Sequence, residues 1–327
     1  MPPLPLAGLR YSQGWGLLHP PAAGPQDAAA LALDLDRRGV NLAFLAGRRA
    51  GGGLALTLAV DAERAAGPDG AAALAPAALL TAYPLTHCLP LAWRLTAGLA
   101  RLGLDPLALA TSPAAAALAL PEGQLEPALA ALAGLVQLPP GAAPQRQQVR
   151  VVQVAPGEEP PAPPRCQVPE TIAVYREDPI RTYGLAAAPE MAWLCAAAPL
   201  AGLDFERGLT ALADAPKPAH LQVALGAGRI GICACLAAAQ APALVAALLA
   251  AGLEPAGPPE PATLVHLQGP HFGDRHGIAA AALVALAEAG AAPLALAGVV
   301  HSIFIALPPE QAAPVCAALA RRFCAPS

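Results

Sequence analysis

The histidines are the side chains best suited to chemistry, and four of the seven lie close together near the C-terminus. They are His266, His271, His276 and His301. A zinc site needs nitrogen or sulfur ligands in a tetrahedral arrangement. His271 and His276 are five positions apart in a loop, which is not the spacing of two ligands on one helix face. We therefore predict no metal site, and we interpret these histidines as solvent-facing or as contacts to a small ligand.

The sequence contains no motif for nucleotide binding or for a catalytic nucleophile. A phosphate-binding loop of the form G-x-x-x-x-G-K-[ST] is absent, and Lys217 is the only lysine. No G-x-S-x-G motif occurs. The glycine-rich run at 226–231 follows a predicted strand but leads into another strand, so no helix N-terminus is available there for a phosphate. We predict no catalytic residue and no cofactor.

Seven cysteines are scattered along the chain, at positions 88, 166, 195, 233, 235, 316 and 324. Their number is odd, and the N-terminal residues lack the basic and apolar segments of a secretory signal. These features predict reduced thiols and a cytoplasmic location. Cys233 and Cys235 lie two positions apart, so on a strand both would point to the same face, which favours a place in the core.

The composition argues against nucleic-acid and membrane partners. The net charge is -4, so no basic surface for nucleic acid or for a membrane is expected. The mean hydropathy is high, at +0.49, but much of the apolar content is alanine. A membrane-spanning helix needs ~20 strongly apolar residues. The longest apolar runs here are diluted by alanine and broken by polar residues or proline, so we predict no membrane span.

The last sixty or so residues show the clearest pattern of secondary structure. Residues 263–268 predict a strand, 278–289 a helix, 293–300 and 302–307 two strands, and 309–323 a closing helix. The loop at 269–277 is glycine-rich and polar. Weaker copies of the same order recur upstream every 65 to 70 residues. That period is typical of a small βαββαβ domain.

The repeats define the predicted domains. We place modules at residues 8–70, 76–154, 171–258 and 261–325, with a proline-rich linker at 155–170. The predicted fold is α+β, with four ferredoxin-like βαββαβ modules in two tandem pairs and antiparallel sheets that carry their helices on one face. Several strands, such as 230–235 and 303–305, are apolar on both sides. Their second face must therefore be covered, by another module, a second copy of the chain or a partner enzyme.

The last module resembles the C-terminal regulatory ACT domain of aspartokinases. The resemblance is carried by the loop Asp274-Arg-His-Gly277, the helical run 277–290, the strand pair that ends at 301–307 and the final helix that ends in Ala320-Arg-Arg-Phe323. It covers about 55 residues closely, and the other three copies share only the pattern. The resemblance identifies the chain as tandem ACT repeats without a kinase domain.

Such ACT domains bind a small effector, usually an amino acid, at the interface between two modules. The N-terminus of a helix suits a carboxylate, because its N–H groups are unpaired and carry partial positive charge. Transferred to this sequence, the resemblance implies a ligand site formed by Gly273, Asp274, Arg275, His276, Gly277, Ile278 and Ala279, with Leu294, Ala295 and Leu296 opposite. In the other copies, only Asp27 and Asp204 occupy a position for a ligand-binding acid, and each is equally interpreted as a helix cap.

Two functions follow as hypotheses. The first is a non-catalytic regulatory or sensor protein, not an enzyme, that binds a small effector such as an amino acid. The alternative is a regulatory subunit of an aspartate kinase in amino-acid biosynthesis, or a relative that carries the kinase name by homology. The predicted partners are the effector, and a second copy or a partner enzyme docked on the sheet faces.

Overall fold

The structure is a computed structural model that describes residues 3–20, 24–50, 53–65, 74–85, 88–147, 179–269, 272 and 275–324. The predicted linker at 155–170 and the strands predicted at 148–154 and 171–175 lie outside the described residues.

The first half of the chain alternates strands and helices. Its elements are β1 (Leu4–Leu18), α1 (Pro25–Arg37), β2 (Leu42–Ala50), β3 (Gly53–Asp61), α2 (Ala62–Ala65), β4 (Ala75–Pro84), α3 (Cys88–Trp93), a π-helical turn (Arg94–Gly98), α4 (Leu99–Arg101), β5 (Ala108–Thr111), β6 (Ala116–Pro121), α5 (Leu125–Leu135), β7 (Val136–Gln137) and β8 (Gln145–Arg146).

The second half repeats this order. Its elements are β9 (Ile180–Arg181), β10 (Gly184–Pro199), α6 (Phe205–Ala213), β11 (His220–Gly226), β12 (Arg229–Ala237), α7 (Ala241–Ala250), β13 (Glu254–Pro255), β14 (Glu260–Gln268), α8 (Ile278–Glu288), β15 (Ala295–Val299), β16 (Ser302–Leu307), α9 (Pro309–Ala320) and β17 (Phe323–Cys324). Most of these elements begin and end within a few residues of the predicted positions.

The strands join into one sheet, which corrects the predicted fold class. Fifteen strands form a single sheet whose main order is β12-β11-β5-β6-β4-β1-β3-β2-β15-β16-β14-β10-β13. Since β12 also pairs with β10, the order closes on itself. The pairs β2–β15 and β5–β11 connect the first half of the chain to the second. The prediction of four modules in two tandem pairs is therefore wrong, because local patterns cannot show which strands pair over long range.

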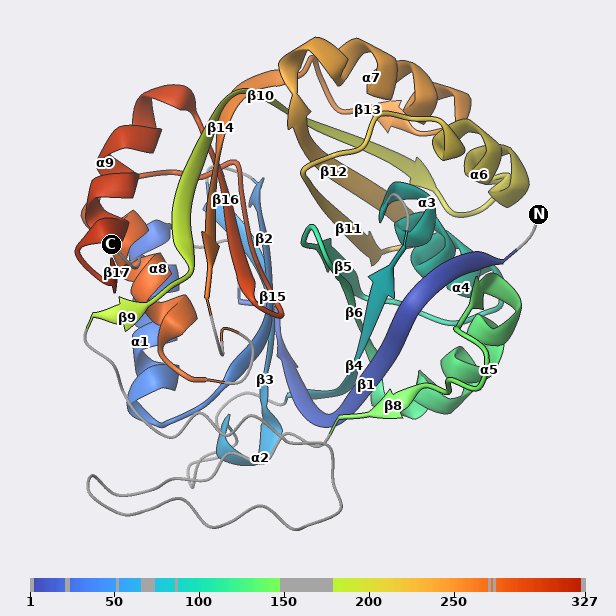
Figure 1. Ribbon diagram of the computed structural model, residues 1–327, viewed down its shortest axis with the longest axis horizontal. Coiled ribbons are helices and arrows are strands. Elements are labelled where there is room, and N and C mark those ends of the chain that lie inside the picture. Colours follow the sequence, from blue (N-terminus) through green and yellow to red (C-terminus); the bar gives the residue numbers. More distant parts are fainter. Residues whose placement is uncertain are drawn as a thin grey trace.

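Two long strands make this closure possible. β1 pairs with β4 along most of its length and with β3 from Trp15 to Leu18. β10 pairs with β14 from Gly184 to Trp193 and with β12 from Met191 to Pro199. Each of these strands thus belongs to both halves of the sheet. In Figure 1, β10 runs across the top of the molecule, between the two groups of strands.

The two halves of the sheet face each other, and the helices lie outside them (Figure 1). Helices α1, α8 and α9 pack on one half and α3, α5, α6 and α7 on the other, each with its own core cluster. Two further clusters contain no helix residue and lie between the halves. They are rich in alanine, including Ala77, Ala108, Ala117 and Ala297, whose small side chains allow the two layers to approach. The second apolar face of the strands is therefore covered within the chain itself.

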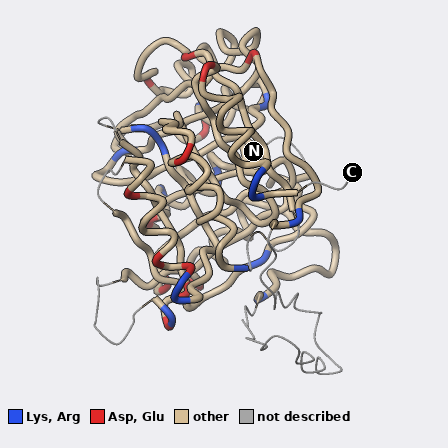
Figure 2. Tube along the Cα trace, turned by 90° about the vertical axis from the view of Figure 1, so that its left-hand side faces the viewer, with Lys and Arg blue, Asp and Glu red and all other residues tan. Residues whose placement is uncertain are grey.

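Basic and acidic residues are interspersed along the chain trace in Figure 2. None of the helices among the described residues has the length and apolar character that a membrane crossing requires.

The cysteines depart in part from the prediction of reduced thiols. Cys195 of β10 and Cys233 of β12 face each other across the strand pair and form a disulfide. Cys88 and Cys235 are free and buried. Burial raises the pKa of the Cys235 thiol to about 12, because the thiolate is poorly solvated there.

Candidate functional site

The predicted ligand site at the start of α8 is partly described, and its side chains are used within the protein. Gly273 and Asp274 lie outside the described residues. Nδ1 of His276 lies 2.7 Å from Oδ1 of Asp36, a side chain of α1 that is 7% exposed. Arg275 also makes an interaction within the chain. His276 of the polar loop therefore connects the start of α8 to α1.

Gly277 shows how tightly these two helices meet. Its φ angle is 86°, in the region that favours glycine. A Cβ atom added there would lie 2.7 Å from Oδ1 of Asp36. Ile278 is buried and Ala279 is half-buried against the core. The close contact between α1 and α8 leaves little room for a ligand at this point.

The remaining predicted residues lie at the starts of β15, α1 and α6, and a ligand-binding role for them stays a prediction. Leu294, Ala295 and Leu296 are buried at the start of β15, where Ala295 and Leu296 pair with β2. Asp27 accepts a hydrogen bond from the backbone N–H of Gly24, 3.1 Å away, at the start of α1. Asp204 accepts one from the N–H of Arg207, 3.0 Å away, at the start of α6. Asp204 is the N-cap of α6, whereas Asp27 is the third helical residue of α1 and bonds back to the N-cap residue, Gly24.

An open space among the described residues lies between the two halves of the sheet. A cavity of about 280 Å³ opens there. It is lined by Pro84 at the end of β4, Cys88 at the start of α3, Ser112 and Pro113 after β5, 186–188 of β10, 217–219 before β11, and Leu264, His266 and Phe304 on β14 and β16. These residues come from six separate stretches of sequence, so only the tertiary fold brings them together.

The cavity has apolar walls and one charged side chain. Lys217, the only lysine of the chain, is exposed at its edge. Its charge acts on the thiol of Cys88, whose pKa is raised by burial and lowered by the Thr111 hydrogen bond and by Lys217. The hydroxyl of Ser112 accepts a hydrogen bond from the N–H of Ala115, 3.1 Å away. Lys217 is thus the group best placed to attract an anion into the cavity.

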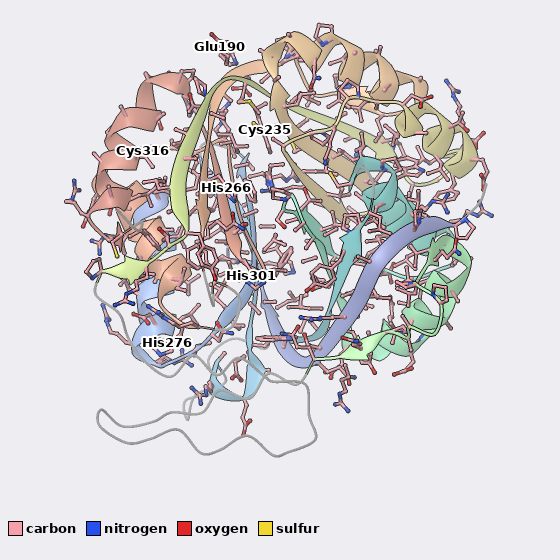
Figure 3. The ribbon with its side chains drawn as sticks, viewed as in Figure 1. Glu190, Cys235, His266, His276, His301 and Cys316 are labelled. Atoms are coloured by element: carbon pink, nitrogen blue, oxygen red, sulfur yellow. A yellow bond between two sulfur atoms is a disulfide. The ribbon has the colours of Figure 1, made fainter. Side chains whose placement is uncertain are left out.

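Phe304 and His266, which line the floor of the cavity, are part of a stack of three rings. Phe304 lies between His266, with ring centroids 4.3 Å apart, and His220, with centroids 5.0 Å apart. Nε2 of His266 lies 3.1 Å from the hydroxyl of Ser302. Figure 3 shows His266 among the central strands, far from His276 beside α1. Burial lowers the pKa of His266, so the ring facing the cavity is neutral near pH 7.

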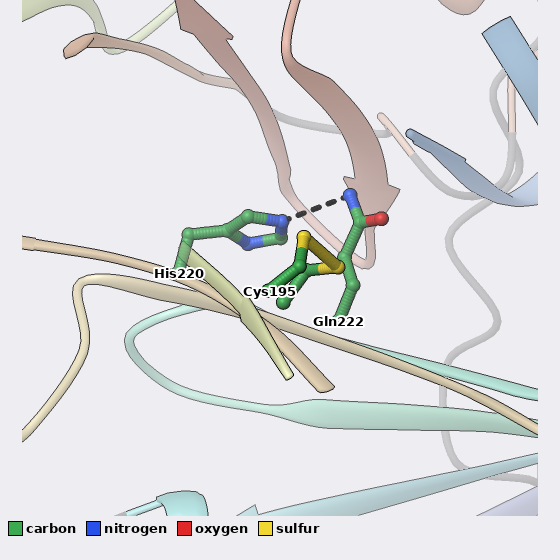
Figure 4. Close-up of a disulfide and its surroundings, with 4 residues drawn as sticks. Cys195, His220 and Gln222 are labelled. Carbon is green, nitrogen blue, oxygen red and sulfur yellow. Dashed lines mark hydrogen bonds between the residues drawn. A yellow bond between two sulfur atoms is a disulfide. The ribbon is translucent and has the colours of Figure 1, made fainter. Parts of the chain in front are cut away.

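His220, a member of this stack, and Gln222 beside it join the two halves of the sheet. Nδ1 of His220 lies 2.9 Å from the carbonyl oxygen of Thr111 and therefore carries the proton. Its Nε2 accepts from the amide of Gln222 at 3.1 Å, and that amide also donates to the carbonyl of Leu296 at 2.9 Å. Figure 4 shows the pair beside the disulfide. Burial lowers the pKa of His220 to about 4, which keeps the ring neutral.

Sequence reasoning missed the cavity residues Lys217, His266, Phe304 and Cys88 as a group. One signal was available, since a single lysine in 327 residues is conspicuous. Its partners could not be found, because the cavity depends on the pairing of β5 with β11 and of β10 with β14. Among the described residues, no group of three or more His, Cys, Asp or Glu side chains is placed to hold a metal ion.

Comparison with known proteins gives a likeness of fold. No family model and no curated protein matches the sequence. The crystal structure of aspartate kinase from Synechocystis matches 96% of this chain with a TM-score of 0.65 and 16% identity. The fold is similar to that of an aspartate kinase. The match covers 55% of the Synechocystis protein, so this chain spans about half its length.

Two structures of the regulatory subunit of aspartate kinase match less well. The subunit from Thermus thermophilus, in its ligand-free form, covers 43% of this chain with a TM-score of 0.35 and 18% identity. The subunit from Thermus flavus covers 43% with a TM-score of 0.37 and 18% identity. Scores this low support no assignment.

The aspartate kinase match corrects three predictions. The identification as ACT repeats that resemble only a regulatory region, with the kinase domain absent, is wrong, because the similarity to an aspartate kinase extends over 96% of the chain. The hypothesis of a free-standing, non-catalytic sensor is overturned by the same match. The expectation that the chain is not an enzyme is corrected as well, since the protein with the matching fold is a kinase. The aspartokinase-like character of the chain is confirmed at the level of the fold.

Proposed function

We propose that the chain is a subunit of an aspartate-kinase-type enzyme in amino-acid biosynthesis. The observation that supports this proposal most strongly is the similarity of fold to an aspartate kinase over 96% of the chain, with a TM-score of 0.65. The second hypothesis drawn from the sequence, a regulatory subunit of an aspartate kinase, agrees with that similarity. The proposed partner is an enzyme chain that carries the nucleotide-binding groups, since Lys217 is the only lysine here.

A small molecule is the second proposed partner, and the cavity between the sheet halves is its proposed site. Binding sites for small molecules are concave, largely apolar and equipped with a few polar groups. The cavity meets this description through Leu264, Phe304, His266 and Lys217.

A cytoplasmic location also belongs to the proposal, because aspartate and ATP are available there. Thiol titration of protein from the cytoplasm then measures whether Cys195 and Cys233 are bonded in that reducing compartment.

Co-purification with activity assays tests the proposed function. The tagged chain is isolated from its source cell, bound proteins are identified, and aspartate-dependent release of ADP from ATP is measured with and without the captured chain. We expect a kinase chain to be recovered, and we expect the assembly to turn over. Recovery of only further copies of this chain, without aspartate-dependent turnover in any fraction, contradicts the proposal.

A further inference from the structure

We propose that the cavity between the two sheet halves binds a short aliphatic carboxylate that carries no ammonium group, such as a 2-oxo acid, with the carboxylate at Lys217. The inference rests on the small-molecule partner proposed above, and it does not require the kinase partner. It differs from the amino-acid effector predicted from the sequence in the chemical class of the ligand.

The size and the walls of the cavity fit a short aliphatic body. A volume of about 280 Å³ corresponds to roughly nine water molecules, at about 30 Å³ each, and thus to a ligand of similar heavy-atom number. The walls are formed by Pro84, alanines 186–188, Leu264 and Phe304. Such walls gain from contact with methyl and methylene groups and offer nothing to a second charged group.

The charges around the cavity fit a monoanion. Lys217 provides one positive charge at the edge. None of the residues that line the cavity in the described structure is Asp or Glu. The nearby titratable groups are neutral near pH 7, because burial lowers the pKa of His266 and raises that of the Cys88 thiol. A carboxylate therefore finds a partner, whereas an ammonium group would lose water without gaining a counter-charge.

The uncharged polar groups fit the rest of such a ligand. The backbone at 217–219 and the Ser112 side chain border the apolar walls. The neutral imidazole of His266, held by Ser302 at 3.1 Å, offers one polar edge to a carbonyl or hydroxyl oxygen. The stack of His266, Phe304 and His220 fixes this edge, because the rings lie nearly parallel, at 5° and 11°. The floor of the cavity is thus formed before a ligand arrives.

Calorimetric titration of the purified chain at low salt and pH 7.5 tests the inference. The probes share one carbon skeleton: 2-oxobutanoate, L-2-aminobutyrate with an ammonium group, and butanamide without a charge. We expect 2-oxobutanoate to bind about tenfold more tightly than either of the other two. Added salt should weaken the binding of 2-oxobutanoate more than that of the other two probes, because the Lys217 side chain is exposed and its charge is screened.

Variants at one position locate the contact. Lys217→Gln weakens 2-oxobutanoate about tenfold, and Lys217→Arg, which keeps the charge, restores binding to within about threefold. Arg229→Gln is the matched control, since Arg229 is an exposed cation at the opposite end of the β11–β12 hairpin. It leaves binding unchanged.

Three results overturn the inference: an L-2-aminobutyrate affinity equal to that of the oxo acid, an unchanged affinity in Lys217→Gln, or no binding of the oxo acid at about 10 mM. Each of these is independent of kinase capture. If no kinase chain is captured but 2-oxobutanoate binds as expected, only the proposed kinase partnership is contradicted. If a kinase chain is captured but 2-oxobutanoate does not bind as expected, only this inference is contradicted.

Discussion

The starts of α8 and α3 are similar places in the fold that serve different ends. At α8, the polar side chain of His276 is bound to Asp36 of α1 at 2.7 Å, and Gly277 allows the two helices to touch. At α3, Pro84 and Cys88 border an open cavity whose single charge, Lys217, comes from another stretch of the chain. His276 at the start of α8 is thus engaged by α1, whereas the described residues around the start of α3 lie beside open space. A site needs room as well as reactive side chains.

The support behind each helix start also differs. Trp93 of α3 packs so closely on α6 that a Cβ atom at Gly208 would lie 2.2 Å from its ring. Its indole N–H donates to the carbonyl of Phe205 at 3.0 Å. The α3–α6 contact is therefore mainly apolar, whereas the α1–α8 contact includes a carboxylate and an imidazole. We expect the α3–α6 contact to contribute more to the free energy of unfolding than the α1–α8 contact.

Trp93→Ala breaks the apolar contact and has the largest expected effect. Trp93 is fully buried, and truncation of a buried aromatic residue costs about 3–5 kcal/mol in the free energy of unfolding. Urea unfolding followed by circular dichroism measures it. Leu102→Ala, at a side chain that is 55% exposed on the following turn, serves as the control and changes the free energy by less than about 0.5 kcal/mol. Equal effects of the two variants would show that α3 is not anchored by Trp93.

Acidification acts on the polar contact between the sheet halves. The pKa of His220 is lowered from 6.5 to about 4 by burial, so the unfolded chain binds a proton more readily than the folded one. The neutral His220 ring makes its full contribution to the free energy of unfolding above pH 6.5. This contribution is lost as the pH falls towards 4. The loss is of the order of 3 kcal/mol.

Unfolding free energies measured in urea at pH 7, 5.5 and 4.5 check this prediction. The His220→Gln variant should lose less stability on acidification than the wild type, because the group that takes up the proton in the unfolded state is gone. His19→Gln, at an exposed residue, should follow the wild-type curve more closely. Parallel curves for the wild type and His220→Gln would contradict the assignment.

Asp36→Asn weakens the contact at the start of α8 and has the smallest expected effect of the three. The side chain is 7% exposed, and the loss of a charged partner for His276 should cost about 1–3 kcal/mol. Asp34→Asn, at a carboxylate that is 54% exposed and paired with Arg38, should cost at most about 1 kcal/mol. Neither variant should change ligand binding. A loss of 2-oxobutanoate affinity in Asp36→Asn would return the ligand site to the predicted loop.

The sequence is sufficient for the elements and insufficient for their arrangement. Helical periodicity predicts residues 278–289 as a helix, and α8 spans Ile278–Glu288. The strands that are apolar on both sides, such as 230–235 and 303–305, correctly indicate that both sheet faces are covered. What covers them depends on pairs such as Leu45–Gly298, more than 250 positions apart in sequence, which no local pattern specifies.

The candidate site shows the same limit. Helix-start chemistry draws attention to Asp204 and His276, which the fold uses for a cap and for a helix contact. Lys217 follows a proline-rich turn without a recognisable motif, and it gains its surroundings only when β10, β14 and β16 lie beside it. Charged residues in loops are equally suited to binding a ligand and to holding the fold, and only the pairing of distant strands decides between the two.

The single lysine allows the central claim to be tested directly. Reductive ¹³C-methylation labels the amine of Lys217 and the N-terminal amine only, and the Lys217→Gln variant identifies the NMR signal of Lys217 by its loss. The labelled chain and its His276→Gln variant are titrated with 2-oxobutanoate. We expect the Lys217 signal to move in both proteins with the same dissociation constant. A ligand that binds without moving this signal, or that binds only when His276 is intact, would contradict it.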